Sequence, residues 1–255
     1  MRRFFVDKIL PENGFVSITG KEARHIRNVL RMKKGETIIL MDRAGQSHEA
    51  TIEAIQHKEV KAQITRAIPP LPPSPVTISL AQALIKFHPM EYLIQKATEL
   101  GIHSIHPFYS ERTVMQLKSA HLKNKMDRWK EIMKSACKQC GRGALPELNA
   151  PLLFEEMINN APHTKSLKIM LWEDEDKGDL KKLLTSVSPA PHVFVIVGPE
   201  GGFTMNEINL ARKAGFHIVS LGNRIVRAET AAVSLLSIIQ YEWGDLSIKN
   251  PLLLY

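Results

Sequence analysis

The chain has 255 residues, 44% of them hydrophobic and 24% charged, which is enough for two modest domains with a sizeable core. It has no apolar run near the roughly 20 residues that span a bilayer, and MRRFFVDKIL has no signal-peptide pattern. Two cysteines cannot build a disulfide framework. The composition therefore excludes an integral membrane protein and a disulfide-rich secreted protein, and it predicts a cytoplasmic one.

Basic residues outnumber acidic ones and are unevenly distributed. The net charge is +8 overall, +5 over residues 1–68, +7 over residues 112–142 and −5 over residues 147–179. Two basic regions and an acidic one predict a protein surface with a basic and an acidic side, of which the basic side meets a polyanion. Nucleic acid is the natural partner of such a surface, and a merely soluble basic enzyme is the alternative.

Residues 1–68 have the pattern of a small β-rich domain. The segments 36–42 and 47–55 are short and are separated by turn residues, which is typical of paired strands. Residues 21–32 are predicted to form a helix whose inward side chains are Ile26, Val29 and Leu30.

A proline-rich segment follows this region. Five prolines fall within residues 67–76, so the segment lacks the amide donors that a helix or a sheet needs. We expect a stiff linker at 69–75, between a first domain at 1–68 and a second at 76–255.

Strands and helices alternate after the linker, which is typical of an α/β domain with a mostly parallel sheet covered by helices. The expected strands span residues 76–84, 102–110, 166–172, 192–198 and 216–222. The expected helices span residues 89–100, 127–140, 206–216 and 231–243.

The helix expected at 127–140 has one apolar face, which consists of Trp129, Ile132, Met133, Ala136, Cys137 and Cys140. The two cysteines are therefore interpreted as packing residues. No second pair of ligands has the spacing of a zinc site, so we expect no metal. The acidic run at 173–176 is interpreted as a solvated loop.

The stretch VIVGPEGGFTMNEI, at 195–208, joins an apolar strand to a helix through Gly-Pro-Glu-Gly-Gly at 198–202. Thr204 and Glu207 have the spacing of a capping box, so the helix begins directly after the glycines. Ligands collect at the carboxyl ends of strands in open α/β sheets, and glycine lets them approach the main chain. The spacing matches no nucleotide-phosphate motif. A ligand-binding loop is the interpretation, and a tight turn without function is the alternative.

A second loop of the same construction lies within residues 218–236. It runs through Leu221 and Gly222 into IVRAET and an apolar helix. The two loops could form opposite walls of a pocket. Arg224 and Arg227 bracket two apolar residues, a mixture that suits a ligand with an aromatic ring and a carboxylate. Alternatively, Arg227 and Glu229 satisfy helix ends and each other.

These loops carry a resemblance to a known family. GPEGGFT, followed after a helix and a strand by LGNRIVRAETAA, resembles the bacterial ribosomal RNA small-subunit uridine-N3 methyltransferases of the knotted SPOUT superfamily. RRFF, HIRNVLRMKKGE, MEYLIQKATELGIHSIHPFYSERTV and DRWKEIMKSACKQCGR are also similar to family segments and follow the family's order, so the resemblance covers nearly the whole chain. IVR, where the family often has ILR, and the segment Lys86-Phe87-His88-Pro89 depart from the pattern, which concerns local RNA contacts only.

The resemblance implies an RNA-binding, PUA-like β-barrel at 1–68 and a SPOUT α/β domain with a deep trefoil knot at 76–255. It implies methylation of uracil N3 in one uridine of 16S ribosomal RNA, uridine 1498 in the usual numbering. S-adenosyl-L-methionine would be the methyl donor and the small ribosomal subunit the setting. A homodimer with packed knotted domains is also implied.

The cofactor site is carried over motif by motif and falls on the two glycine loops. The residues expected to hold S-adenosyl-L-methionine are Leu171, Val197, Gly198, Pro199, Glu200, Gly201, Leu221, Gly222, Ile225, Val226 and Ala231.

The reaction adds a demand of its own. Uracil N3 carries a proton, so we expect a general base, or a cation that stabilises the uracil anion. Glu200 and Glu229 are the candidate bases, and Arg227 and Arg224 are the candidate stabilisers. Arg227 and Glu200 rank first because their motifs place them by the cofactor. For Glu229, a structural role at the helix dipole is an equal alternative.

Phosphate contacts are expected from two clusters of basic residues. The first is Arg2, Arg3, Arg24, Arg27 and Arg31, and the second is Lys123, Lys125, Lys130, Lys134, Lys138 and Arg142. Each residue alone is more often solvated, and only the clustering favours RNA contact. Because N3 lies on the Watson–Crick edge, the target base must be unpaired or flipped out.

Two other functions stay open at this point. One is a related methyltransferase that acts on a ribose 2′-hydroxyl, which the absence of an Asn-x-Gly motif in GIHSIHPFYSER disfavours. The other is a non-catalytic RNA-binding assembly factor, in which an intact cofactor loop would be unusual.

Overall fold

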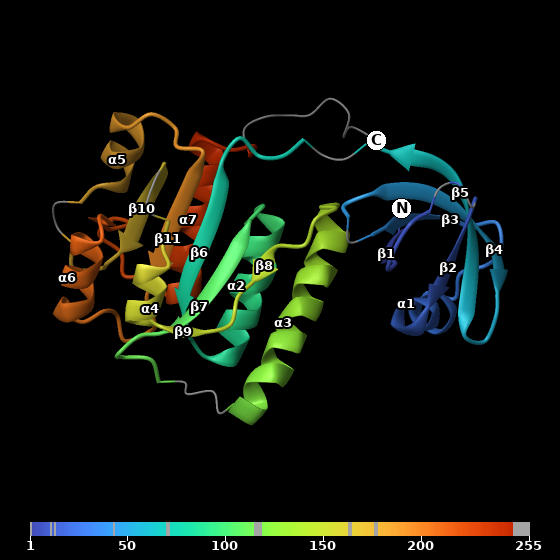
Figure 1. Ribbon diagram of the computed structural model, residues 1–255, viewed down its shortest axis with the longest axis horizontal. Helices are drawn as coiled ribbons and strands as arrows, with labels where there is room; N and C mark the ends of the chain where they lie inside the picture. The colour runs from blue at the N-terminus through green and yellow to red at the C-terminus, as the bar shows by residue number, and fades with distance from the viewer. Residues whose placement is uncertain are drawn as a thin grey trace. The chain divides into compact units, whose positions relative to one another are not determined.

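The computed structural model describes residues 2–10, 12, 14–42, 44–69, 72–114, 119–162, 165–175 and 178–246. The chain divides into two compact units (Figure 1). The first unit is Met1–Pro72 together with Lys134–Leu145, and the second is Pro73–Met133 together with Pro146–Tyr255. One boundary lies in the proline-rich segment. The inclusion of residues 134–145 in the first unit was not expected from the sequence.

The first unit contains a five-stranded sheet in the order β1-β3-β4-β5-β2. Its strands are β1 (Arg2–Phe5), β2 (Phe15–Thr19), β3 (Thr37–Met41), β4 (Ser47–Ile55) and β5 (Glu59–Ile68). Neighbouring strands are antiparallel, except for the parallel pair of β1 and β3. Alternate side chains such as Phe4, Ile38 and Ile52 are buried in one core, as the two-residue period of a strand requires.

The helix predicted at 21–32 is shorter and less regular than expected. It consists of α1 (Gly20–Arg24) and a π-helical turn, η2 (His25–Val29), in which the Leu30 amide donates to the His25 carbonyl at 3.0 Å. The wider turn rotates the side chains that follow it. Ile26 is buried as predicted, but the prediction for Val29 is wrong, because its side chain is 67% exposed.

The second unit contains a sheet in the order β12-β10-β11-β6-β7-β8, with β9 also paired to β7. Its strands are β6 (Thr77–Ala83), β7 (Ser104–Tyr109), β8 (Glu147–Leu148), β9 (Leu152–Leu153), β10 (Ser166–Leu171), β11 (His192–Val197) and β12 (His217–Val219). Every pair is parallel, which confirms the predicted α/β sheet. The strands β8 and β9 were missed because two residues show no periodicity.

Helices cover both faces of this sheet (Figure 1). Their bounds are α2 (Phe87–Glu99), α3 (Ser119–Cys140), α4 (Phe154–Asn159), α5 (Leu180–Ser186), α6 (Met205–Lys213) and α7 (Ala228–Glu242). On one face, α4 and α6 share a core with Phe108, Phe194 and Met170. The alternate residues Val193 and Val195 are buried on the other face, where α2 and α7 pack together. No helix in the described ranges combines the length and the apolar character needed to cross a membrane.

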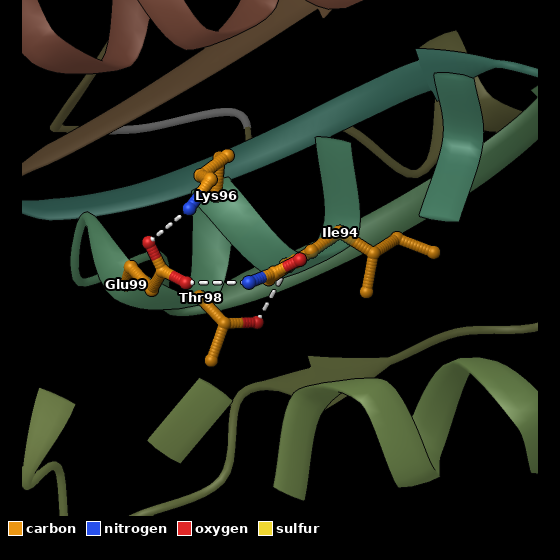
Figure 2. A network of polar contacts seen from close by, with 5 residues as sticks. Ile94, Lys96, Thr98 and Glu99 are labelled. Atoms are coloured by element: carbon orange, nitrogen blue, oxygen red, sulfur yellow. Dashed lines mark hydrogen bonds and ion pairs between the residues drawn. The ribbon is translucent and has the colours of Figure 1, made fainter. Parts of the chain in front are cut away.

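A small polar network holds the C-terminal half of α2 (Figure 2). Glu99 accepts hydrogen bonds from Gln95 at 2.9 Å and from Lys96 at 2.8 Å. The buried Thr98 hydroxyl donates to the Ile94 carbonyl at 2.7 Å, so it is not left unpaired. These contacts stabilise the helix whose first turn borders the site described below.

The apolar face predicted for α3 is largely buried. Trp129, Met133, Ala136 and Cys137 are buried, whereas Ile132 and Cys140 are half-buried. Burial raises the pKa of the Cys137 thiol to about 12, so the thiol stays protonated at neutral pH. Its Sγ lies 3.7 Å from the Ala144 carbonyl oxygen. Cys137 is thus a buried packing residue, as predicted, whereas Cys140 packs with only part of its side chain.

Candidate active site

A cavity of about 800 Å³ opens at the carboxyl edge of the sheet of the second unit. Three segments line it directly after β10, β11 and β12, and the start of α2 adds Lys86 and Pro89. Its volume is within the range of roughly 300 to 1,000 Å³ that is usual for small-molecule sites. The position agrees with the rule that ligands of open α/β sheets bind beyond the carboxyl ends of strands.

The first wall of the cavity is the glycine wall, residues 198–204. Its chain folds back on itself, because the Gly202 amide donates to the Pro199 carbonyl at 3.0 Å. The buried Gln82 lies on β6, the neighbour of β11 in the sheet, and its side-chain amide donates to the Gly198 carbonyl at 3.2 Å. The wall therefore has a defined shape before any ligand binds.

Two further hydrogen bonds tie the glycine wall to its neighbours. The Lys86 amide, just before α2, donates to Glu200 Oε1 at 3.1 Å, and Arg112 donates to the Gly201 carbonyl at 3.1 Å. Gly201 itself is absent from the cavity lining. A Cβ added there would lie 3.2 Å from Cβ of Arg112, so its small size serves packing against Arg112.

One glycine of this wall is required by its backbone. Gly202 has a φ of +68°, which disfavours any residue with a side chain. A Cβ at this position would also overlap the Glu173 carboxylate. The conformation therefore demands glycine, and a side chain would in addition displace the Glu173 carboxylate.

The predicted capping box of α6 is confirmed. Thr204 Oγ1 accepts from the Glu207 amide at 3.3 Å, and Glu207 Oε2 accepts from the Thr204 amide at 2.9 Å. The buried Glu207 also accepts from the Glu111 amide at 3.1 Å. One carboxylate thus joins the end of the glycine wall to the loop after β7.

The second wall is the arginine wall, residues 220–229. Residues 222–227 are exposed, and Ile225 is 89% exposed. Within the described part of the chain, no side-chain hydrogen bond or ion pair holds Arg224, Arg227 or Glu229. In particular, Arg227 and Glu229 do not pair with each other, so the alternative of mutual satisfaction gains no support. This wall offers two guanidinium groups and apolar side chains to a ligand.

The third lining segment, residues 172–175, directly follows β10. It contains acidic residues that were predicted to form a solvated loop. Glu173 and Glu175 both line the cavity, whereas Asp176 lies outside the described residues. Glu175 Oε2 is paired with Arg212 at 2.9 Å, and Glu173 has no partner among the described residues. The order of the strands could have predicted that Glu173 and Glu175 line the cavity, because both residues directly follow β10, at the same sheet edge as the two glycine loops.

The structure brings the predicted cofactor and catalytic residues together, apart from Gly201. Those that line the cavity are Leu171, Val197, Gly198, Pro199, Glu200, Leu221, Gly222, Arg224, Ile225, Val226, Arg227, Glu229 and Ala231. Four carboxylates, two guanidiniums and one ammonium group therefore line the cavity, together with the polar Ser220 and Asn223 and with apolar and main-chain groups. Such a surface suits a ligand that carries charges of both signs.

The residues predicted to contact RNA fall in the first unit, except for Lys123, Lys125 and Lys130. The members in the first unit are Arg2, Arg3, Arg24, Arg27, Arg31, Lys134, Lys138 and Arg142. Residues far apart in the sequence are thus gathered in one unit, which charge counting could not predict.

Some of these basic groups already have partners within the first unit. The Arg3 guanidinium donates to the Lys138 and Gln139 carbonyls, both at 3.1 Å, so it caps the end of α3. Lys138 is paired with Glu22 at 2.8 Å. Arg27 donates to the His57 carbonyl. The side chains of Arg2, Arg24 and Arg31 are exposed, and Arg24 also donates to the Gly20 carbonyl at 3.4 Å.

The chain matches two known domain families, which define the class of protein. Residues 72–240 match the RNA methyltransferase domain family, and residues 18–65 match the RNA methyltransferase PUA domain family. The parallel sheet with its cavity and the small β-rich unit thus correspond to the two parts of an RNA methyltransferase with a PUA domain.

Individual relatives narrow the assignment. The chain is 30% identical over 244 residues to the ribosomal RNA small subunit methyltransferase E of Buchnera aphidicola from Acyrthosiphon pisum, which covers 95% of the chain and 94% of the relative. It is 29% identical to the Bacillus subtilis protein of the same name, over 95% and 97% of the two chains. The chain belongs to the ribosomal RNA small subunit methyltransferase E family, which confirms the resemblance found in its motifs.

Solved structures agree in fold over almost the whole chain. The ribosomal RNA small subunit methyltransferase E of Neisseria gonorrhoeae, bound to S-adenosyl methionine, superimposes with a TM-score of 0.88 at 32% identity, over 96% of this chain and 99% of that one. A Legionella pneumophila protein solved with the bound cofactor SAM has a TM-score of 0.88 at 33% identity, over 96% and 98% of the two chains.

Proposed function

We propose that this protein transfers a methyl group from S-adenosyl-L-methionine to N3 of one uridine in 16S ribosomal RNA. Family membership supports the methyltransferase activity and the ribosomal RNA substrate. The observation that carries the proposal is the cavity of about 800 Å³ between the glycine wall and the arginine wall. The choice of uracil N3 rests on the motif resemblance.

The residues around the cavity fit the proposed cofactor. Apolar side chains of Leu171, Leu221 and Ile225 suit the adenine ring, and the exposed main chain of the glycine wall suits its hydrogen-bonding edge. The carboxylates of the cavity suit the ammonium and sulfonium charges, and the two arginines suit the methionine carboxylate or the RNA. We expect Glu173 to accept from the ammonium, because it has no partner among the described residues.

When bound, S-adenosyl-L-methionine supplies an electrophilic methyl group on its sulfonium. The chain must then present N3 to that methyl and remove the N3 proton, so that the N3–carbon bond forms as the sulfur–carbon bond breaks. Negative charge spreads onto the uracil carbonyl oxygens once the proton leaves. We assign Arg227 to the stabilisation of this charge, because its guanidinium is exposed at the cavity and has no competing partner among the described residues.

The candidates for the proton acceptor are Glu200 and Glu229. Glu200 Oε1 already accepts from the Lys86 amide, which holds it against the start of α2. Glu229 lies half-buried in the first turn of α7 and lines the cavity without such a bond. This difference favours Glu229 as the base and Glu200 as a positioning residue.

The RNA would be held by the basic residues of the first unit. Arg2, Arg24 and Arg31 are exposed and suit phosphate contacts. Reversing the charge of Arg24 and Arg31 together should weaken RNA binding and flatten its dependence on salt. An unchanged salt slope would move the phosphate contacts to other residues.

Methylation of ribosomal RNA tests the proposal directly. The protein is incubated with methyl-labelled S-adenosyl-L-methionine and either 16S ribosomal RNA or small ribosomal subunits, and the label is mapped by mass spectrometry. We expect it on N3 of a single uridine. A label on a ribose or on another base, or no label, would overturn the proposed target, and calorimetry with the cofactor alone tests the cavity separately.

The trefoil knot stays a prediction from the resemblance. It is supported by two hydrogen bonds at the end of β12: the Trp172 amide donates to the Val219 carbonyl and the Ser220 amide to the Gly178 carbonyl, both at 3.0 Å. Pulling the chain from both ends in a single-molecule experiment should leave it shorter than its full contour. A fully extended length would contradict the knot.

The homodimer is likewise a proposal. Its support is the exposed apolar character of the C-terminal region, where Ile238, Tyr241 and Leu246 are 36%, 63% and 51% exposed. Light scattering on the purified protein should give twice the monomer mass, and a monomer at micromolar concentration would contradict it.

A further inference from the structure

We propose that Phe87 and Lys125 form a stacking subsite for an RNA nucleotide that neighbours the target uridine. The subsite lies at the rim of the cofactor cavity, within the second unit. The inference rests on the proposed function, since it adds a contact to the RNA that the enzyme methylates. The sequence marked this segment only as a departure from the family pattern.

Phe87 is the first residue of α2, the helix whose start borders the cavity. Lys86 and Pro89, one position before Phe87 and two after it, line the cavity, whereas Phe87 itself is not part of the lining. Phe87 lies between them in the sequence, and its side chain is 40% exposed. A nucleotide next to a base inserted in the cavity would therefore come within reach of this ring.

A cation lies directly on the ring. Lys125 Nζ, from α3, is 3.4 Å from the centroid of Phe87. Lys125 pairs with no carboxylate among the described residues. Its neighbour Arg128, in contrast, is paired with Glu91 at 3.2 Å. The ammonium of Lys125 is thus held by a weak contact, from which it can turn toward a phosphate.

The chemistry of this pair fits a nucleotide. Bases stack on aromatic rings without regard to sequence, because every base has a π-face, and a nearby ammonium neutralises the phosphate of the same nucleotide. Single-stranded RNA is recognised mainly in this way. A flipped or unpaired target leaves its neighbours unstacked, and a ring at the rim would restore one stack.

The test measures RNA and cofactor binding separately. A fluorescent 16S ribosomal RNA fragment that contains the methylated uridine reports RNA affinity by anisotropy, and calorimetry reports affinity for S-adenosyl-L-methionine. Phe87→Ala should weaken RNA binding roughly 5- to 150-fold, the range measured for the loss of one base stack. It should raise KM for the RNA to a similar extent and leave cofactor affinity unchanged.

Three further variants separate stacking from a structural role. Phe87→Trp should retain RNA affinity, because its ring is larger and equally flat. Lys125→Gln should lower the slope of log affinity against log salt by about 0.7, the loss of one phosphate contact on a single strand. Leu153→Ala, which truncates a 60% exposed apolar side chain elsewhere in the second unit, should change neither affinity.

The outcomes distinguish this inference from the proposed function. If the wild-type protein binds neither cofactor nor RNA, the proposed function fails. If the wild type methylates normally and Phe87→Ala binds RNA equally well, the subsite proposal is wrong and the proposed function stands. The exposed ring would then contact a protein instead of RNA. Loss of cofactor affinity in Phe87→Ala would show that the ring supports the cavity, which also overturns the subsite. Should Phe87→Ala not fold, Phe87→Leu and Lys125→Gln keep the test valid.

Discussion

The two walls of the cavity differ in how firmly the second unit holds them. Gln82, Lys86 and Arg112 all bond to the glycine wall, and Gly202 and Phe203 within it are buried. In the arginine wall, residues 222–227 are exposed, and no side-chain hydrogen bond involves them within the described ranges. Both loops have the same sequence pattern, a strand followed by glycine and then a helix. Hydrogen bonds nevertheless fix the glycine wall, whereas the arginine wall is exposed.

This difference separates two tasks. A fixed wall can recognise a ligand by shape, because its main chain is already in place and little conformational entropy is lost on binding. An open wall can close over the ligand and give its side chains new partners. We therefore expect substitutions in the glycine wall to act on folding as well as on cofactor affinity. Substitutions in the arginine wall should leave folding almost unchanged and act on the rate of methyl transfer or on cofactor affinity.

The largest expected effect concerns the two candidate bases. Glu229→Gln removes the proton acceptor that we assign to the arginine wall, so kcat should fall by about 10²- to 10⁴-fold. Glu200→Gln should have a small effect, because an amide oxygen can still accept from the Lys86 amide. Single-turnover transfer of labelled methyl groups into small subunits measures both. A collapse of the rate in Glu200→Gln alone would reassign the base to the glycine wall.

Arg227→Ala comes next. Loss of the group that stabilises the uracil anion should lower kcat by about 10²- to 10³-fold, as for other donors to a developing oxyanion. Because Arg227 is exposed and makes no side-chain cap at α7, the stability of the free protein should hardly change. Chemical denaturation and cofactor calorimetry serve as controls. An equal loss of cofactor affinity would mean that Arg227 binds the methionine carboxylate instead.

A pair of glycines tests the contrast in rigidity directly. Gly202 and Gly222 both have positive φ, +68° and +96°, but only at Gly202 would a Cβ meet another group. Gly222→Ala should therefore cost only the strain of the left-handed conformation, about 1 kcal/mol. In Gly202→Ala the Glu173 carboxylate must also turn aside, which should add roughly 0.5–1.5 kcal/mol to that strain. Urea unfolding of both variants measures the difference, and equal losses would remove the distinction between the walls.

The smallest effect is expected at Ile225. Its side chain is 89% exposed in the free protein, so Ile225→Val should not change the free energy of unfolding. If the arginine wall closes over the adenine ring, the lost methylene should weaken cofactor binding about fourfold, the equivalent of roughly 0.8 kcal/mol. Isothermal titration at two temperatures would detect it. An affinity identical to that of the wild type would indicate that Ile225 stays in solvent in the complex.

Local patterns in the chain were enough for the elements that border the cavity. The alternation of apolar strands with punctuated helices predicted β6, β7, β10, β11 and β12 and the helices α2, α3, α6 and α7, because the period of a strand or helix is set within a few residues. The short helices α4 and α5 were missed. The capping box of Thr204 and Glu207 is local as well. Together with the rule for open sheets, these patterns placed both glycine loops at one edge.

Contacts between distant segments were beyond such patterns. The place of Glu173 in the cavity, the packing of Gly201 against Arg112 and the gathering of residues 134–145 into the first unit all depend on which segments fold side by side. The π-helical turn that exposes Val29 depends in the same way on its surroundings. Periodicity and capping act over one or two turns of chain, whereas packing joins residues tens to hundreds of positions apart, and only the folded chain decides which of them meet.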